Sequence, residues 1–131
     1  MEYACRALAQ LAKCVDARQL TRLDDLAQRE AVSANFLVQI LNDLRRAGLV
    51  ESRRGMGGGY ILAGKPENIT LRQIVEAVDP TLLQATVSSG GESGAAVANA
   101  WRRVGDHVVA SLDAITLANI TETPAEPMFH I

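Results

Sequence analysis

Basic side chains gather in one stretch of the chain. Residues 33–65 carry five basic residues against two acidic ones, a net charge of +3, although the whole chain of 131 residues has a formal charge of −2. The basic residues are Arg45, Arg46, Arg53, Arg54 and Lys65. Such a charge run is most often a solvated face, but grouped guanidinium and ammonium ions also bind the phosphates of nucleic acid. The rest of the chain carries a net charge of −5, so the positive charge is concentrated in this one stretch.

The cysteines and histidines do not form a pattern that supports catalysis or metal binding. Cys5 and Cys14 are nine residues apart on a helix expected over 2–14, about 900° of rotation, so they face opposite sides. Buried thiols of this kind are usually small hydrophobes, and Cys14 is the better candidate for a redox role. His107 and His130 have no nucleophile near them in the sequence. We therefore expect no enzyme and no metal site.

Two helices with a short turn between them would position part of the basic stretch. Thr21 is expected to cap a helix over 22–29, and Ser33 a longer one over 34–47 that ends at Gly48. The apolar residues of the second helix recur at helical spacing. This arrangement is typical of a helix-turn-helix.

A hairpin would position the remaining arginines. Residues 49–53 and 60–62 read as strands joined by a glycine-rich turn over 54–59. Thr70 then begins a helix over 71–78 with the residues of a capping box. The expected fold is mainly α with a small β-hairpin, a winged helix-turn-helix domain over residues 1–80.

The last part of the chain predicts a dimerisation element. We expect a mobile loop over 81–96, a dimerisation helix over 97–120 and an extended tail over 121–131. One apolar stripe follows the helix: Val97, Trp101, Val104, Val108, Leu112 and Ile115. A stripe outside the small domain's own core favours a partner, here a second copy, although Trp101 could instead wall a ligand pocket.

The composition places the protein among cytoplasmic chains. No apolar run approaches the roughly 18 residues that span a bilayer, and no signal peptide is visible. Two cysteines exclude a disulfide framework. We expect no membrane association.

Four runs carry a resemblance to a known family. They are DLAQREAVSANFLVQIL (25–41), LRRAGLV (44–50), RGMGGGY (54–60) and ITLRQIV (69–75). Together they resemble the Rrf2 family of winged-helix transcription regulators, whose members include IscR, NsrR and CymR. The resemblance implies a homodimer, with a long helix swapped across the two-fold axis, that binds a palindromic operator in double-stranded DNA. We expect it to act as a repressor.

The resemblance also implies which residues read DNA. The family's major-groove readers fall on Ser33, Asn35, Phe36 and Gln39, and its minor-groove arginine falls on Arg54. These types suit the task, because a helix N-terminus attracts phosphate, glutamine can bond to adenine, and arginine enters narrow minor grooves. The other candidate contacts are Arg45, Arg46, Arg53, Gly57, Gly58 and Tyr60.

The chain departs from the resemblance in its cysteines. Cluster-binding members have three cysteines between the short helix and the long one, whereas residues 79–100 have none. Since iron–sulfur clusters need thiolate ligands, we expect no cluster and no other cofactor. The inducing signal would then be a small-molecule effector, oxidation of Cys14 or a protein partner, in that order of preference.

A second function remains open from the sequence. Winged helices also bind proteins, so the chain could be a protein-interaction module without DNA binding. Its acidic remainder is consistent with that alternative. Salt-dependent retention on DNA would distinguish the two functions.

Overall fold

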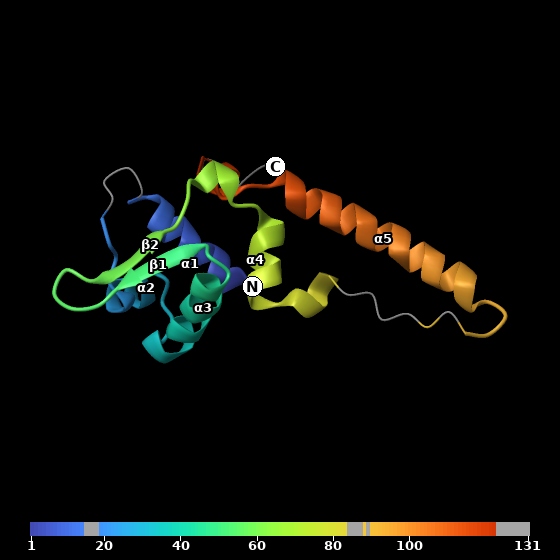
Figure 1. The fold of residues 1–131 in the computed structure, drawn as a ribbon, viewed down its shortest axis with the longest axis horizontal. Coiled ribbons are helices and arrows are strands. Elements are labelled where there is room, and N and C mark those ends of the chain that lie inside the picture. The colour runs from blue at the N-terminus through green and yellow to red at the C-terminus, as the bar shows by residue number, and fades with distance from the viewer. Residues whose placement is uncertain (15–18, 84–87, 89, 123–131) are drawn as a thin grey trace, which may run out of the picture.

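The computed structural model describes residues 1–14, 19–83, 88 and 90–122 (Figure 1). Its α-helices are α1 (Glu2–Ala12), α2 (Leu23–Arg29), α3 (Ala34–Arg46), α4 (Leu71–Val78), α5 (Gly94–Ala114) and α6 (Leu117–Glu122). The two strands are β1 (Val50–Arg53) and β2 (Gly59–Leu62), and the short 3-10 helices are η1 (Pro66–Asn68) and η2 (Pro80–Leu83). None of the described helices is long and apolar enough to cross a membrane.

The core lies under α1, which contacts α3, α4, α6 and β2. Leucines of α1 pack in this core with apolar residues from each of the other elements. The fully buried large side chains are Leu8, Leu11, Leu26, Leu37, Leu41, Leu44, Val50, Ile74 and Leu117. The apolar circumference of α1 is therefore covered largely within its own chain, because α6 returns to pack on it.

The expected winged helix-turn-helix is confirmed. α2 and α3 form the helix pair, and β1 pairs antiparallel with β2 in the register Val50 to Leu62 and Arg53 to Gly59. The hairpin extends away from α4 as a wing beside α2 and α3 (Figure 1).

Three of the predicted helix ends are also found. The Ser33 hydroxyl accepts the Phe36 N–H at 3.2 Å, and α3 ends before Gly48, whose φ is +79°. Thr70 and Gln73 make the full capping box, so α4 spans the predicted residues 71–78.

Thr21 was wrongly predicted as a helix cap. The N-cap of α2 is Arg22, which makes no side-chain cap bond. Thr21 instead is buried and pairs with Tyr60 of the wing: its N–H donates to the Tyr60 carbonyl at 2.9 Å and its carbonyl accepts the Tyr60 N–H at 2.8 Å. Its backbone is committed to a strand-like bridge, which ties the start of α2 to the wing.

The long helix begins earlier than the sequence suggested. α5 starts at Gly94, inside the loop expected over 81–96, and residues 81–83 of that loop belong to η2. Residues 84–87 and 89 of the loop, and 123–131 of the expected tail, lie outside the described residues. α5 ends at Ala114, where the extended Ile115 turns the chain into α6. In Figure 1, α5 points away from the winged domain.

Candidate nucleic-acid interface

The exposed face of α3 carries polar side chains held by a buried apolar face. Leu37, Leu41 and Leu44 are fully buried and fix the helix on the core. Asn35 and Gln39, four residues apart, are exposed and lie on one side of the helix. Both amides are therefore available to a groove of DNA, as the family resemblance implies.

The first turn of α3 combines a cap with an exposed aromatic ring. The Ser33 oxygen is engaged by the Phe36 N–H, so toward a phosphate the hydroxyl has its hydrogen to donate. Phe36 is 48% exposed, and its ring lies edge-on to Tyr3, with centroids 5.6 Å apart. Tyr3 thus supports the apolar Phe36 side chain at the N-terminal end of α3, the end that would enter a groove.

The second half of α3 adds positive charge. Gln39, Arg45 and Arg46 line one shallow hollow of about 310 Å³ with Asn42 and Asp43. Arg46 forms an ion pair with Asp43, whereas Arg45 has no ion pair within the described part of the chain. Arg45 therefore offers the less compensated charge to a phosphate.

The wing presents two more arginines. Arg53 closes β1 opposite Gly59, Arg54 follows in the turn, and both are exposed, as is Gly57. Met56 at the tip is fully exposed. The tip is thus open to a partner on its outer surface.

Gly58 and Tyr60 have structural roles in the wing. A Cβ at Gly58 would lie 2.4 Å from the Arg53 carbonyl oxygen, so the turn itself requires glycine there. Tyr60 is partly buried against the core and holds Thr21 through its backbone. Their predicted contact with DNA stays a prediction.

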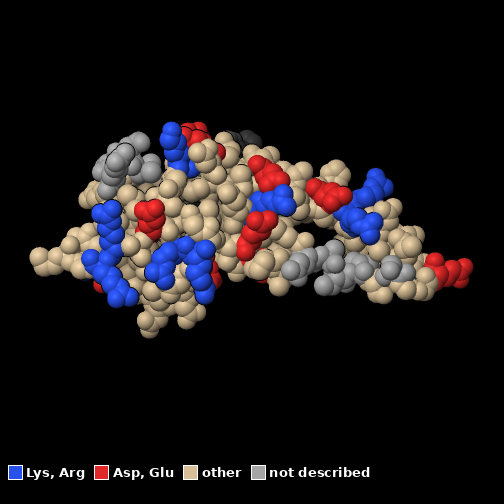
Figure 2. Space-filling model, viewed as in Figure 1, with Lys and Arg blue, Asp and Glu red and all other residues tan. Residues whose placement is uncertain are grey.

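Basic side chains are concentrated at one end of the molecule, although others lie along α5. Figure 2 shows blue side chains gathered over the end that carries α3 and the wing. This distribution matches the +3 charge of residues 33–65 within a chain of −2. An uneven field of this kind attracts a polyanion to one face despite the acidic total.

Tyr3 and Arg6 were missed by the sequence reasoning. The Arg6 guanidinium lies 5.1 Å from the centre of the Tyr3 ring, and its Nη2 is 2.8 Å from Glu2 Oε1. Both residues stood on a predicted helix, but the contact of Tyr3 with Phe36 depends on how α1 packs against α3. The exposed aromatic Phe36 was the only available signal that a neighbour supports it.

A second surface lies along α5. Four residues of the predicted stripe on α5 are large and exposed, with Trp101 at 56% and Val104 at 51%, and Leu112 is half-buried. Ile115 is exposed too, but it lies beyond the helix as its extended C-cap. An apolar row of this length on one helix face is typical of an interaction surface.

The two thiols are separate from both surfaces. Cys5 is half-buried on α1 and packs against the core, and this burial raises the pKa of its thiol. Cys14 follows α1 in a turn, and its Sγ accepts a long hydrogen bond from the Thr21 hydroxyl at 3.9 Å. Among the described residues, no three His, Cys, Asp or Glu side chains are grouped to hold a metal ion.

Comparison with known proteins gives a consistent match. A family model described as Rrf2, iron-dependent transcriptional regulator, matches residues 1–123. The chain is 34% identical over 133 aligned residues to the HTH-type transcriptional regulator IscR of Cereibacter sphaeroides, covering 95% of this chain and 86% of the relative.

A second relative matches in both sequence and structure. CymR of Bacillus subtilis is 36% identical over 115 residues, covering 85% of this chain and 82% of the relative. The solved structure of that protein, described as a global cysteine regulator, superposes with a TM-score of 0.80 at 32% identity. It covers 92% of this chain and 91% of the other.

Proposed function

Because the chain belongs to the Rrf2 family of winged-helix transcriptional regulators, we propose that it binds a palindromic operator as a homodimer and represses by occupying it. The observation that carries the proposal is the shared surface at one end of the molecule. There, the exposed amides of α3 lie on the same helix as Arg45, and α3 packs against β1, the strand that leads into the arginines of the wing.

In the proposed complex, α3 enters the major groove. Gln39 is suited to a bidentate contact with an adenine edge, and Asn35 and Ser33 lie where a helix N-terminus meets the phosphate backbone. Arg54 on the wing enters the adjacent narrow minor groove. Arg45 and Arg53 supply phosphate contacts, which position the protein and give most of the salt dependence.

The dimer in this proposal forms along α5. Trp101, Val104 and Val108 project from a helix that is otherwise attached to the domain near its C-terminal end. At 100° per residue, the stripe occupies an arc of about 80°, narrow enough to be covered by one partner helix. A second copy supplies such a helix and two-fold symmetry, which matches a palindrome.

We propose further that the protein holds no iron–sulfur cluster, although the family's description names iron. What supports this is the donor set: residues 79–100 have no cysteine, Cys5 is packed on the core, and Cys14 lies in the turn after α1. These residues do not fit a cluster held by thiolates of one subunit. The signal then enters by a small molecule beside Trp101, by oxidation of Cys14 or through a protein partner.

Selection from random duplexes tests the DNA-binding proposal. The full-length protein is incubated with a library of random double-stranded DNA at moderate salt, and the retained duplexes are sequenced over several rounds. Enrichment of one inverted repeat is expected. Retention of no sequence above the library background would overturn the proposal in favour of a protein-binding module.

Metal analysis tests the cofactor proposal separately. Protein purified without oxygen is expected to be colourless, with iron and sulfide well below one per subunit. A brown sample with about two or more irons per subunit would overturn the cofactor proposal.

A further inference from the structure

The base of α5 is held by the start of α4. Thr70 and Thr116 form an antiparallel bridge, in which the Leu71 N–H donates to the Ile115 carbonyl at 2.9 Å and the Leu117 N–H to the Ile69 carbonyl at 2.7 Å. The segment directly after α5, residues 115–117, is thus bonded through its backbone to the segment that leads into α4.

Both sides of this bridge are themselves helix caps. Thr70 caps α4 with Gln73, and Thr116 caps α6 in the same way: its hydroxyl accepts the Asn119 N–H at 3.2 Å, and Asn119 Oδ1 accepts the Thr116 N–H at 3.0 Å. Two capping boxes lie back to back. Backbone hydrogen bonds therefore hold both sides of this joint, and α5 leaves it through Ile115.

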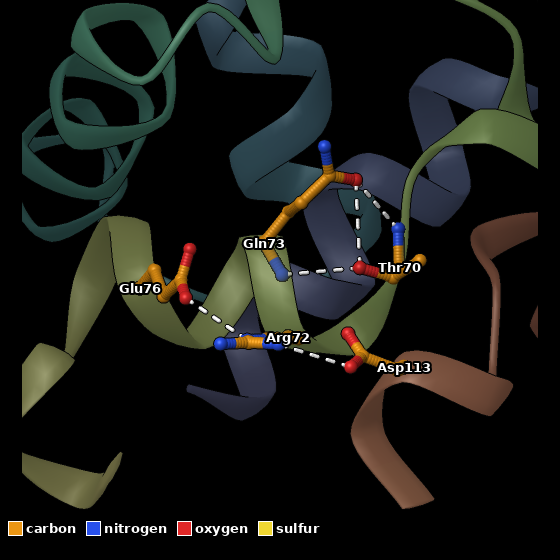
Figure 3. Close-up of polar contacts among 5 residues, drawn as sticks. All are labelled: Thr70, Arg72, Gln73, Glu76 and Asp113. Carbon is orange, nitrogen blue, oxygen red and sulfur yellow. Dashed lines mark hydrogen bonds and ion pairs between the residues drawn. The ribbon is translucent and has the colours of Figure 1, made fainter. Parts of the chain in front are cut away.

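One side chain links the joint to α5 itself. Arg72 lies in the first turn of α4, and its Nη1 is 3.0 Å from Oδ2 of Asp113 in the last turn of α5 (Figure 3). Its Nε is also 3.1 Å from Glu76 Oε1 on α4. The hydrogen bond to Asp113, before the pair with Glu76, raises the pKa of Arg72. The guanidinium thus bridges a carboxylate on each helix.

We propose that Arg72 is a positioning residue that fixes the direction in which α5 leaves the DNA-binding domain. The inference rests on the proposed dimer, in which that direction sets the separation of the two α3 helices. Among the described residues it is the one ion pair that joins α5 to another element. Because an exposed pair adds little to the stability of the fold, its loss is expected to appear in the orientation of α5 rather than in unfolding. α5 has 21 residues and is about 31 Å long, so a tilt of about 10° at its base moves its far end by about 5 Å.

A shift of that size is large against the spacing of DNA. Adjacent base pairs are about 3.4 Å apart, and each adds about 35° of rotation between half-sites. Arg72 is therefore expected to determine how strictly the dimer demands one half-site spacing, with little effect on dimerisation.

The test measures affinity against spacing. The probes are the palindromic duplex enriched by the full-length protein and versions with one base pair added or removed at its centre. The affinity of wild type is expected to be on the order of tenfold lower for the altered duplexes, a loss similar to that caused by one mismatched base pair. Arg72→Gln is expected to lose less than about threefold in affinity on the altered duplexes. Arg72→Lys is expected to recover discrimination only in part, because an ammonium lacks the fork that reaches both carboxylates.

Glu76→Gln is the matched control. It removes the pair within α4 and leaves the pair with Asp113, so its spacing profile is expected to match wild type. Retention of the full wild-type discrimination by Arg72→Gln would overturn the proposal. If that variant does not dimerise, Arg72→Asp with Asp113→Arg in the Glu76→Gln background must restore the wild-type profile, and failure to do so is equally decisive.

A second measurement does not depend on DNA. A spin label is placed on the exposed wing tip by Met56→Cys in a Cys5→Ala, Cys14→Ser background, and the distance between labels is measured across the dimer. A narrow distribution is expected, broadened by Arg72→Gln and narrowed again by the charge exchange. If wild type binds no duplex, the proposed function fails, but the distance distribution still tests the role of Arg72. A distribution that Arg72→Gln leaves as narrow as in wild type would contradict that role.

Discussion

The arginines at the end of α3 differ in the partners that they already have. Arg46 is paired with Asp43, whereas Arg45 has no ion pair in the described part of the chain. The logarithm of the binding constant falls linearly with the logarithm of the salt concentration, and removing one phosphate contact makes that slope shallower by about 0.9. We expect Arg45→Ala to flatten the slope by about that amount per subunit and Arg46→Ala by less, measured by anisotropy over a potassium chloride series.

Arg103→Ala is the control for this pair of variants, because Arg103 is exposed on α5 away from the interface. Its slope should equal that of wild type. A larger effect for Arg46→Ala than for Arg45→Ala would show that the ion pair with Asp43 does not lower the charge available to DNA.

The Cys5 thiol on α1 should lose its proton at a higher pH than an exposed thiol. Burial raises the pKa of Cys5, because it disfavours the charged thiolate. In a Cys14→Ser variant, the rate of alkylation by iodoacetamide should therefore rise with pH at a higher midpoint in the folded protein than in urea. Mass spectrometry of quenched samples measures both curves. A folded midpoint at or below the unfolded one is incompatible with this burial.

Among the elements, those defined by local signals were predictable from the sequence. Ser33, Thr70 and Gly48 act within one turn of their own helices, so α3 and α4 were predicted to within a residue. The bridge between Thr21 and Tyr60 joins distant parts of the chain, and no local pattern encodes it. The start of α5 was predicted too late, because Gly94 and the alanines after it resemble in composition the glycine-rich loop before them. Alanine nevertheless favours a helix.

The candidate site follows the same division. The exposed positions of Asn35, Gln39 and Arg54 followed from periodicity and from the family motifs. The support that Tyr3 gives to Phe36 is a contact between helices that the sequence does not place side by side. Long-range packing therefore decides which neighbours complete the interface.

The bridge between the wing and α2 predicts an unusually sensitive glycine. Gly59 has φ +147°, and a Cβ there would lie 2.5 Å from the Thr21 carbonyl oxygen. We expect Gly59→Ala to lower the free energy of unfolding by about 1–3 kcal/mol, because strain and a backbone clash combine. Urea denaturation followed by circular dichroism measures the change.

Gly64→Ala is the matched control, since nothing lies within 4 Å of a Cβ built at Gly64. Its effect should stay within about 0.5 kcal/mol. Equal stability of the two variants would contradict the close approach of Thr21 to the wing.

For the whole molecule, the stripe on α5 predicts a concentration-dependent assembly. Trp101 is 56% exposed in one chain and becomes buried only when a partner covers it. We expect Trp101→Ala to cost about 3–5 kcal/mol of dimer stability, the usual loss for a buried large side chain. Sedimentation equilibrium measures it, with Arg102→Ala as the exposed control off the stripe. A wild-type monomer at micromolar concentration would rule out the dimer.

Binding of the enriched duplex by wild type and by the double variant Arg54→Ala, Gln39→Ala tests the proposed DNA recognition most directly. Anisotropy over a salt series gives both affinities and both slopes. The two side chains contribute about 1–3 kcal/mol each, so the double variant should bind at least about thirtyfold more weakly, and wild-type affinity should fall steeply with salt. Equal affinity of the two proteins for that duplex would contradict the assignment of α3 and the wing as the surface that reads DNA.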